Sequence, residues 1–302
     1  MVRQLLFIYT FLVVFIARSQ DINFDFADFV FNPAYVVDQE SFVSASVYDR
    51  QSKIAGSDRT YGLLGQYNFM NYNSAIGLSV FNNNFASLKS TSFKLNYKYK
   101  VKFDSVSYLS LGLGVGAEQL RLSNQYVFED QLSLLDTRVV ETTESISTNS
   151  NTSFVTDLGV MYTHRQFTIG GALIGLLSPS WRFVERDIVR PTQFNSSISY
   201  EMNLNSSKTL KLKPVVFSVL SSRKTRLGLN TKIDFSGYEG FEGDVYLGIE
   251  FVDDISQRSL TTWSVYTGYS QNNIAFQYGI GNGLVYGKQL GFNNRIIISY
   301  YF

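Results

Sequence analysis

His164 is the only histidine of this 302-residue chain, and it is the first residue to examine for chemistry because an imidazole often serves as the base of a hydrolase. It stands beside Arg165, between Tyr162 and Phe167, in a segment that reads as a short turn, with no neighbouring serine or carboxylate motif. A hydrolase needs a nucleophile within hydrogen-bond reach of its base. We therefore expect a solvated, interfacial histidine and no enzyme active site.

Composition excludes other kinds of chemistry. The chain contains no cysteine, so it has no thiolate site, and one histidine is too few for a multi-histidine metal site. A formal net charge of +1 provides no polybasic surface for nucleic acid. The acidic residues between Leu122 and Asn151 match no calcium-loop spacing, although a leucine cluster among them leaves a partner contact open. We expect no metal and no cofactor.

Charged side chains recur on one face of alternating segments, most clearly at residues 91–100, where lysines alternate with aromatic and leucine side chains. One interpretation is a channel or a peptide-binding interior, and the other is mutual ion pairing that fills a closed barrel. Both signs occur in similar numbers, which favours ion pairing because a selective pore concentrates one sign. The main inward-facing residues are expected to be Lys94, Lys98, Glu118, Glu201, Arg226, Lys232 and Glu250.

The elements that would position these residues are strands. Alternating segments recur through the chain and number fourteen, an even count, as expected for a bacterial barrel. With 25 Phe, 20 Tyr and 22 Gly but only 17% charged residues, the sequence predicts an all-β fold, a transmembrane antiparallel β-barrel. Gly112, Gly114 and Gly116 share one face of such a segment, which favours packing or bending over a phosphate loop. The strands are expected near 41–49, 61–70, 74–82, 91–101, 106–121, 152–163, 166–175, 193–203, 210–221, 224–236, 242–252, 261–270, 273–280 and 293–302.

The expected connections alternate in length. Those after even-numbered strands are short, whereas those after odd-numbered strands, including 83–90 and 176–192, are mostly long, with a tight turn at 222–223 as the exception. Bacterial barrels place short turns in the periplasm and long loops outside. This parity predicts that both termini of the mature chain lie in the periplasm and that the last strand closes against the first.

The two ends of the sequence carry targeting signals. Residues 1–19 have a positive charge at Arg3, an apolar run and a small-x-small site ending at Ser19, which predicts a signal peptide. Residues 20–40 then form a periplasmic or plug-like segment, and residues 41–302 form one barrel domain. At the other end, Ile298, Tyr300 and Phe302 share one face of the last strand. A terminal aromatic of this kind is the mark that outer-membrane barrels present to their assembly machinery.

The segment before the first strand contains Phe31, Asn32, Pro33, Ala34 and Tyr35. An Asn-Pro-Ala-Tyr motif soon after the signal peptide, followed by a strand, resembles the PorP/SprF family of outer-membrane proteins from Bacteroidetes-type bacteria. Similar stretches at 75–82, 109–116 and 210–216 extend this resemblance over most of residues 21–302. The chain departs from the family at Val36-Val37-Asp38, where a glycine usually follows soon after the tyrosine, and in the length of the 122–151 loop.

The resemblance implies a function that the residues alone do not. It implies a component or accessory of type IX secretion and gliding motility that helps secreted cargo proteins or adhesins reach and stay at the cell surface. The implied partners are membrane lipid, the cargo or surface adhesin, a periplasmic peptidoglycan-associated lipoprotein and the barrel assembly machinery. The alternative is a diffusion channel or hydrophobic-solute transporter with the N-terminal segment as its plug.

Overall fold

The structure is a computed structural model that describes residues 28–35, 41–50, 58–85, 88–122, 150–182, 187–222, 224–236, 243–255, 262–283 and 292–302. The expected signal peptide, parts of the 20–40 segment and the acidic loop between Leu122 and Asn151 lie outside these ranges. Among the described residues, no helix is both long and apolar enough to cross a membrane.

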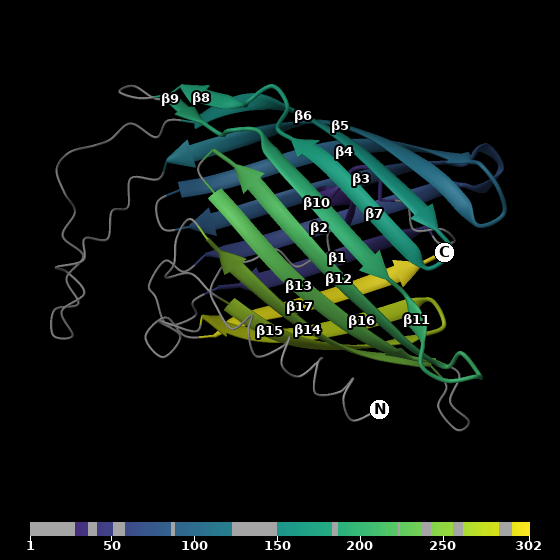
Figure 1. The fold of residues 1–302 in the computed structure, drawn as a ribbon. Helices are drawn as coiled ribbons and strands as arrows, with labels where there is room; N and C mark the ends of the chain where they lie inside the picture. Colours follow the sequence, from purple (N-terminus) through teal and green to yellow (C-terminus); the bar gives the residue numbers. More distant parts are fainter. Residues whose placement is uncertain are drawn as a thin grey trace, which may run out of the picture.

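Fourteen antiparallel strands form a closed β-barrel, as the sequence predicted (Figure 1). The eighth strand is interrupted at Glu201 and is therefore divided into β10 and β11. A separate two-stranded sheet, β8 and β9, lies in the connection between β7 and β10. The strand bounds are β1 Phe42–Asp49, β2 Arg59–Phe69, β3 Ser74–Phe85, β4 Leu88–Lys102, β5 Ser107–Leu122, β6 Ser150–His164, β7 Phe167–Ile174, β8 Ser180–Arg182, β9 Asp187–Val189, β10 Gln193–Tyr200, β11 Met202–Asn203, β12 Leu210–Ser221, β13 Lys224–Phe235, β14 Asp244–Asp254, β15 Thr262–Gln271, β16 Ile274–Gly283 and β17 Asn293–Tyr301.

The barrel closes between the first and last strands, which confirms that prediction. β1 pairs with β17 in a register that runs from Phe42 opposite Tyr301 to Asp49 opposite Asn294. The backbone N–H of Phe302 donates to the carbonyl of Ser41 at 2.9 Å. The expected assembly-signal residues all lie on the outer face and are more than half exposed: Ile298, Tyr300 and Phe302.

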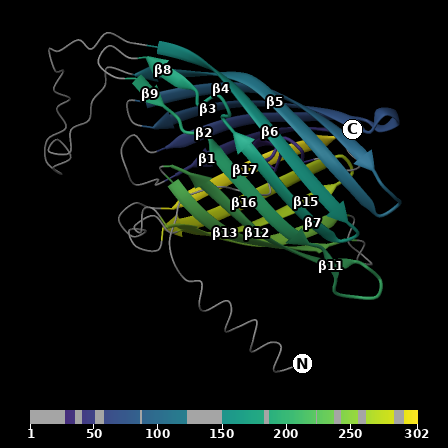
Figure 2. The ribbon, with the colours of Figure 1, turned by 45° about the horizontal axis from the view of Figure 1, so that its top comes forward.

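Connection lengths divide the barrel into a short-turn end, which holds the C-terminus, and a long-loop end, where β8 and β9 lie (Figure 2). The long connection expected at 83–90 is wrong, because β3 continues to Phe85 and β4 begins at Leu88. The connection at 176–192 also differs from a plain loop, since it contains β8 and β9.

The wall is polar inside and apolar outside. On β4, Lys98 is 0% exposed, whereas Phe93 on the opposite face is 51% exposed. A protein surrounded by water buries its aromatic side chains and exposes its lysines, so this distribution requires an apolar solvent around the barrel. The predicted alternation of lumen-facing and lipid-facing positions is therefore the one observed on β4.

Candidate functional site

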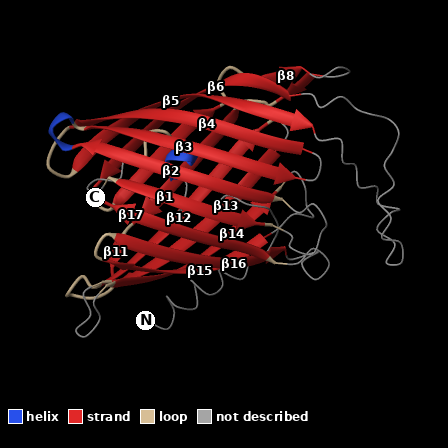
Figure 3. Cartoon of the chain, turned by 180° about the vertical axis from the view of Figure 1, so that it is seen from behind, coloured by secondary structure: helices blue, strands red, loops and turns tan. Residues whose placement is uncertain are grey.

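A short segment of the chain lies inside the barrel. It consists of α2, Asp28–Phe31, and the turn Asn32–Tyr35 that follows it (Figure 3). Its contacts are with the inner faces of β5, β6, β7, β10 and β12. We call Phe31–Tyr35 the lumenal segment. The lumenal segment thus lies within the barrel, and the periplasmic or plug-like role of residues 20–40 stays a prediction.

Asn32 links the lumenal segment to the wall through hydrogen bonds of its side chain. Its side-chain amide donates to the carbonyls of Val160 at 3.2 Å and Gly171 at 3.3 Å. Its side-chain oxygen accepts from the N–H of Ala34 at 2.9 Å, and its backbone oxygen accepts from Tyr35 at 2.9 Å. One side chain thus closes the Pro-Ala turn and joins it to two strands.

Glycines leave the wall beneath this turn without side chains. A Cβ at Gly112 on β5 would lie 2.2 Å from the carbonyl carbon of Pro33 and 2.2 Å from the nitrogen of Ala34. A Cβ at Gly159, which is paired with Gly112, would lie 2.1 Å from the side-chain oxygen of Asn32. Because real Cβ atoms do not approach other atoms so closely, the Pro-Ala backbone rests on a surface that only glycine provides.

The two aromatic residues of the segment bind different parts of the wall. Phe31 is 5% exposed, packs edge-on against Phe217 of β12 at 5.9 Å between ring centroids, and accepts at its carbonyl from Asn195 at 2.8 Å. The hydroxyl of Tyr35 accepts from Lys213 at 3.0 Å. Phe31 therefore joins an apolar cluster with Val215, Phe217, Val219 and Val252.

An ion pair crosses the same glycine row. Lys94 of β4 donates to Asp157 of β6 at 2.6 Å, although β5 runs between these strands. Gly116 stands opposite Lys94 and Gly114 opposite Asp157, so no side chain of β5 separates them. Asp157 is 2% exposed and also accepts from the N–H of Gly175 at 2.8 Å.

Other inward charges are paired as well. Arg226 donates to Asp254 at 3.1 Å, and Lys232 lies 3.0 Å from Asp234. Glu250 accepts from Asn230 at 3.2 Å. At these places charged side chains meet an opposite charge or an amide, and mutual ion pairing as the filling of the barrel stays a prediction.

The remaining predicted lumen residues occupy different surroundings. Lys98 is fully buried and donates to the side-chain oxygen of Gln66. Glu201 instead lies at the short-turn rim, where its side chain is 46% exposed and faces Lys211 at 3.5 Å. Lys98 is thus a residue of the inner wall, whereas Glu201 marks its edge, where the interruption between β10 and β11 breaks the alternation.

Glu118 anchors the β8–β9 hairpin at the long-loop end. Its carboxylate accepts from Arg190 at 2.6 Å and from Ser90 at 3.1 Å, and its backbone carbonyl accepts from Nε1 of Trp181 at 2.8 Å. Trp181 is 2% exposed and packs on Leu120, a lumen-facing residue of β5. The hairpin is therefore folded onto the mouth of the barrel.

Replacing Trp181 with phenylalanine is expected to loosen this hairpin by about 2 kcal/mol, because an aromatic side chain remains but the indole N–H hydrogen bond and the contacts of the second ring are lost. Hydrogen exchange at the amide of Arg190, which donates to the carbonyl of Pro179, measures the change. Trp263→Phe, on the outer face of β15, is the matched control. Equal protection of this amide in Trp181→Phe and the wild type would contradict the anchoring role.

His164 has neighbours that the sequence did not indicate. Its Nδ1 lies 2.7 Å from Oγ of Ser107, which stands opposite it in the β5–β6 register. Asp104 accepts from the backbone N–H groups of Val106 and Ser107, both at 2.7 Å. The sequence around His164 contains no serine or carboxylate motif, but the strand register brings Ser107, 57 positions away, beside it.

The arrangement at His164 nevertheless suits a turn. Asp104 occupies the two backbone N–H groups nearest Ser107, which are the donors that an oxyanion at that serine would need. The N–H of Val106, together with the Ser107 hydroxyl, lowers the pKa of the Asp104 carboxyl below its usual range. Asp104 lies in the connection between β4 and β5, outside the spanning strands.

The lowered pKa of Asp104 gives the β4–β5 turn a pH dependence. Because the charged form is the one bound in the folded state, the stabilisation is present at neutral pH and is lost as the pH falls through the lowered pKa. Amide protection of Val106 and Ser107 should therefore decline below about pH 4. In Asp104→Asn, which cannot titrate, the decline should disappear. A decline of the same size in this variant would exclude Asp104 as its source.

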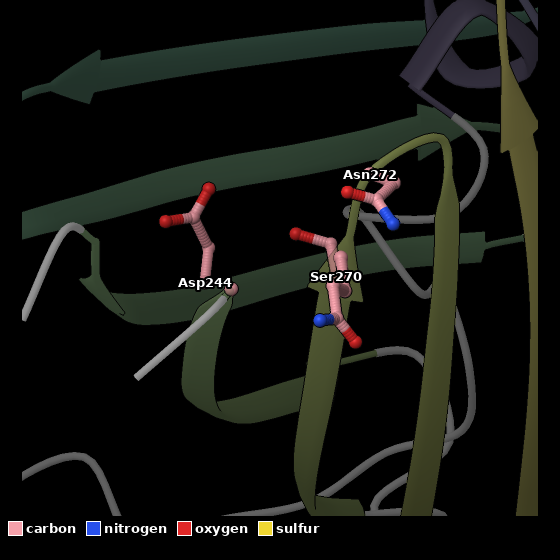
Figure 4. Close-up of a pocket in the computed structure, with 5 residues that line it drawn as sticks. Asp244, Ser270 and Asn272 are labelled. Carbon is pink, nitrogen blue, oxygen red and sulfur yellow. The ribbon is translucent and has the colours of Figure 1, made fainter. Parts of the chain in front are cut away.

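A shallow polar cavity of about 350 Å³ lies at the short-turn end, between the start of β14 and the β15–β16 turn (Figure 4). Its lining holds one carboxylate, that of Asp244, together with the side chains of Ser270, Gln271 and Asn272. Across the described ranges, no group of three or more His, Cys, Asp or Glu side chains could hold a metal ion. The lumenal segment and its wall are therefore the more developed site.

Comparison with known proteins assigns the family. The profile described as "Type IX secretion system membrane protein PorP/SprF" matches residues 17–297. The chain belongs to the PorP/SprF family. The lumenal segment of this PorP/SprF barrel is thus the Asn-Pro-Ala-Tyr motif on which the resemblance first rested, and the outer membrane is its location.

Solved structures show the same architecture. The CymD monoaromatic hydrocarbon channel has 10% identity and a TM-score of 0.53, with 89% of this chain and 90% of CymD covered. A deltaS2S3 mutant of the TodX monoaromatic hydrocarbon channel has 10% identity and a TM-score of 0.52, with 94% and 95% covered. CdiB from Acinetobacter baumannii has 10% identity and a TM-score of 0.50, with 88% and 60% covered. At such identity these likenesses show the fold alone. A search of curated proteins found no match.

Several residues of the site did not stand out in the sequence. Gly159 and Asn195 bind the lumenal segment, and Asp157 and Trp181 hold neighbouring elements. For the glycines a signal was present, since glycines at alternate positions place open surface on one face of a strand. The sequence carries no such signal for Asn195 and Asp157. Their partners, Phe31 and Lys94, are more than 60 residues away and are brought close only by the strand register and the path of the lumenal segment.

Proposed function

We propose that this PorP/SprF chain is a non-enzymatic outer-membrane component of the type IX secretion machinery that supports secretion and surface attachment of cargo proteins or adhesins. The family match over residues 17–297 carries this proposal. In this arrangement the short-turn end faces the periplasm and contacts a peptidoglycan-associated lipoprotein. The long-loop end meets the cargo, and the outer-facing Ile298, Tyr300 and Phe302 are read by the assembly machinery.

Affinity purification from native membranes tests the proposal. Tagged chain is extracted in mild detergent, and co-purifying proteins are identified by mass spectrometry against a control purification on another outer-membrane barrel of the same cells. Enrichment of type IX components together with surface adhesins or cargo is the expected result. Enrichment of neither would reject the secretion role and leave the barrel assignment intact.

A diffusion channel or hydrophobic-solute transporter is the second candidate. The cluster of Val215, Val219 and Val252 beneath Phe31 favours it, because departure of the N-terminal plug would uncover an apolar strip on a polar inner wall. CymD and TodX, of similar fold, are monoaromatic hydrocarbon channels. Steady conductance of the purified wild-type barrel in a planar bilayer would favour this candidate over the secretion role.

The non-enzymatic part of the proposal has its own test. Ser107 and His164 form the one serine–histidine contact that suggests hydrolysis in the part of the chain described here. Purified wild-type protein is expected to cleave phospholipid and p-nitrophenyl esters no faster than His164→Ala. A rate that depends on His164 would identify an enzyme.

A further inference from the structure

We infer that the inner wall formed by β5, β6, β7, β10 and β12 is a peptide-binding site, whose tethered ligand is the lumenal segment. A partner protein's peptide with the same Phe-Asn-Pro-Ala-Tyr chemistry binds there when the tethered segment leaves. The inference deepens the proposed function and rests on it for the biological partner. The binding site itself rests on the geometry of the wall.

The wall selects asparagine at the second position of the ligand. The side-chain amide supplies donors to the carbonyls of Val160 and Gly171, while the side-chain oxygen accepts from the ligand's own backbone. Aspartate cannot donate to carbonyls, and alanine can neither donate nor accept. Among side chains of this length, an amide alone satisfies both requirements.

The wall also selects for a small residue after proline. Ala34 is 0% exposed, and its backbone lies on the bare surface of Gly112 and Gly159. Proline is suited to the position before it, because it needs no acceptor for an N–H group and fixes the backbone before binding. The inner wall therefore recognises the shape of the ligand's backbone as well as the ligand's polar groups.

The two ends of the ligand bind an apolar cluster and a lysine, respectively. An aromatic ring enters the apolar cluster around Phe217, and Asn195 fixes its carbonyl. A phenolic hydroxyl meets Lys213. This spacing of an apolar end and a hydrogen-bonding end sets the direction in which the peptide lies.

The lumenal segment behaves as a ligand because it is not part of the wall. It contributes no strand to the sheet, whose ladder closes through β1 and β17 without it. Only residues 36–40 separate it from Ser41 at the start of the barrel. A tether this short gives an effective concentration on the order of millimolar, so a free peptide competes poorly until the segment is weakened.

Fluorescence anisotropy of a dye-labelled Phe-Asn-Pro-Ala-Tyr peptide tests the inference on the purified full chain. The Asn32→Ala variant, whose own segment has lost the Asn32 side-chain hydrogen bonds to the wall, is expected to bind the peptide about tenfold more tightly than the wild type. A Phe-Ala-Pro-Ala-Tyr peptide should bind that variant about tenfold more weakly. Adding Gly112→Val should abolish binding, whereas adding Gly65→Val, a glycine with room for a side chain, should not.

Equal binding to wild type and Asn32→Ala, or equal binding of the two peptides, would overturn the inference. If Asn32→Ala fails to fold, hydrogen exchange at the Ala34 amide of the wild-type chain provides a second measurement. Millimolar peptide should speed this exchange about tenfold, because the bound peptide keeps the tethered segment away from the wall. An unchanged rate would overturn the inference. Peptide binding without type IX components in the purification would reject the proposed function and retain the site.

Discussion

Asp157→Asn is expected to lower the free energy of unfolding of the barrel by about 3–5 kcal/mol, the largest loss that we expect from a single charge. The substitution keeps the shape of the side chain and an acceptor for the N–H of Gly175. It removes the charge that faces Lys94, whose side chain is only 12% exposed. A lysine left without its counter-ion inside the wall must either lose its proton or remain charged away from water, and both alternatives are costly.

Urea unfolding in lipid vesicles measures this loss. Asp234→Asn is the matched control, since it removes the same charge from the pair with Lys232, where the two side chains are 25% and 31% exposed. Water screens that pair, so its loss should cost at most about 1 kcal/mol. Equal losses in the two variants would show that the Lys94–Asp157 pair is as well solvated as the exposed one.

Gly112→Val is expected to expel the lumenal segment while preserving the strand ladder. The first carbon of the new side chain would lie 2.2 Å from the backbone of both Pro33 and Ala34, and neither the β5 strand nor the turn can yield by the ångström or more required. Valine itself favours strands, so β5 gains local propensity. The expected defect is therefore confined to docking, which should weaken by at least about 2.7 kcal/mol, or about a hundredfold.

Hydrogen exchange at the backbone amide of Ala34 reports the expulsion. Ala34 is fully buried in the docked state, and its amide should exchange about a hundredfold faster in Gly112→Val. Gly65→Val is the control, because its Cβ would find its nearest neighbour, the carbonyl oxygen of Phe42, at 3.7 Å. Slow exchange of the Ala34 amide in both variants would mean that the segment docks without the glycine surface.

The strand order of the barrel was readable from the sequence because a wall between lipid and lumen imposes a period of two. The error at 83–90 has a local cause. Asn82, Asn83 and Asn84 resemble a loop, yet in the barrel Asn82 donates to Thr91 at 2.9 Å and Asn84 donates to Asn82 at 3.1 Å. Polar side chains that satisfy one another along β3 and across to β4 extend the ladder beyond the apolar pattern.

The site was predictable only in part. Alternation indicates which residues face inward, as for Lys94 and Lys98, but it does not indicate their partners. Lys94 meets a carboxylate two strands away only because β5 presents glycines between them. In the same way, the motif at Asn32 was recognisable, whereas the carbonyls of Val160 and Gly171 that bind it carry no signature in a sequence.

The lumenal segment has a consequence for the order of folding. It precedes the whole barrel in the chain, yet its hydrogen-bond partners follow it by 128 to 178 residues. Contacts between such distant residues form late, because the intervening loop must first be closed at an entropic cost. The wall that receives Asn32 does not exist until β5 to β7 have paired. The lumenal segment, synthesised before every strand of the barrel, is thus the last part to dock, and the interior is completed after the sheet.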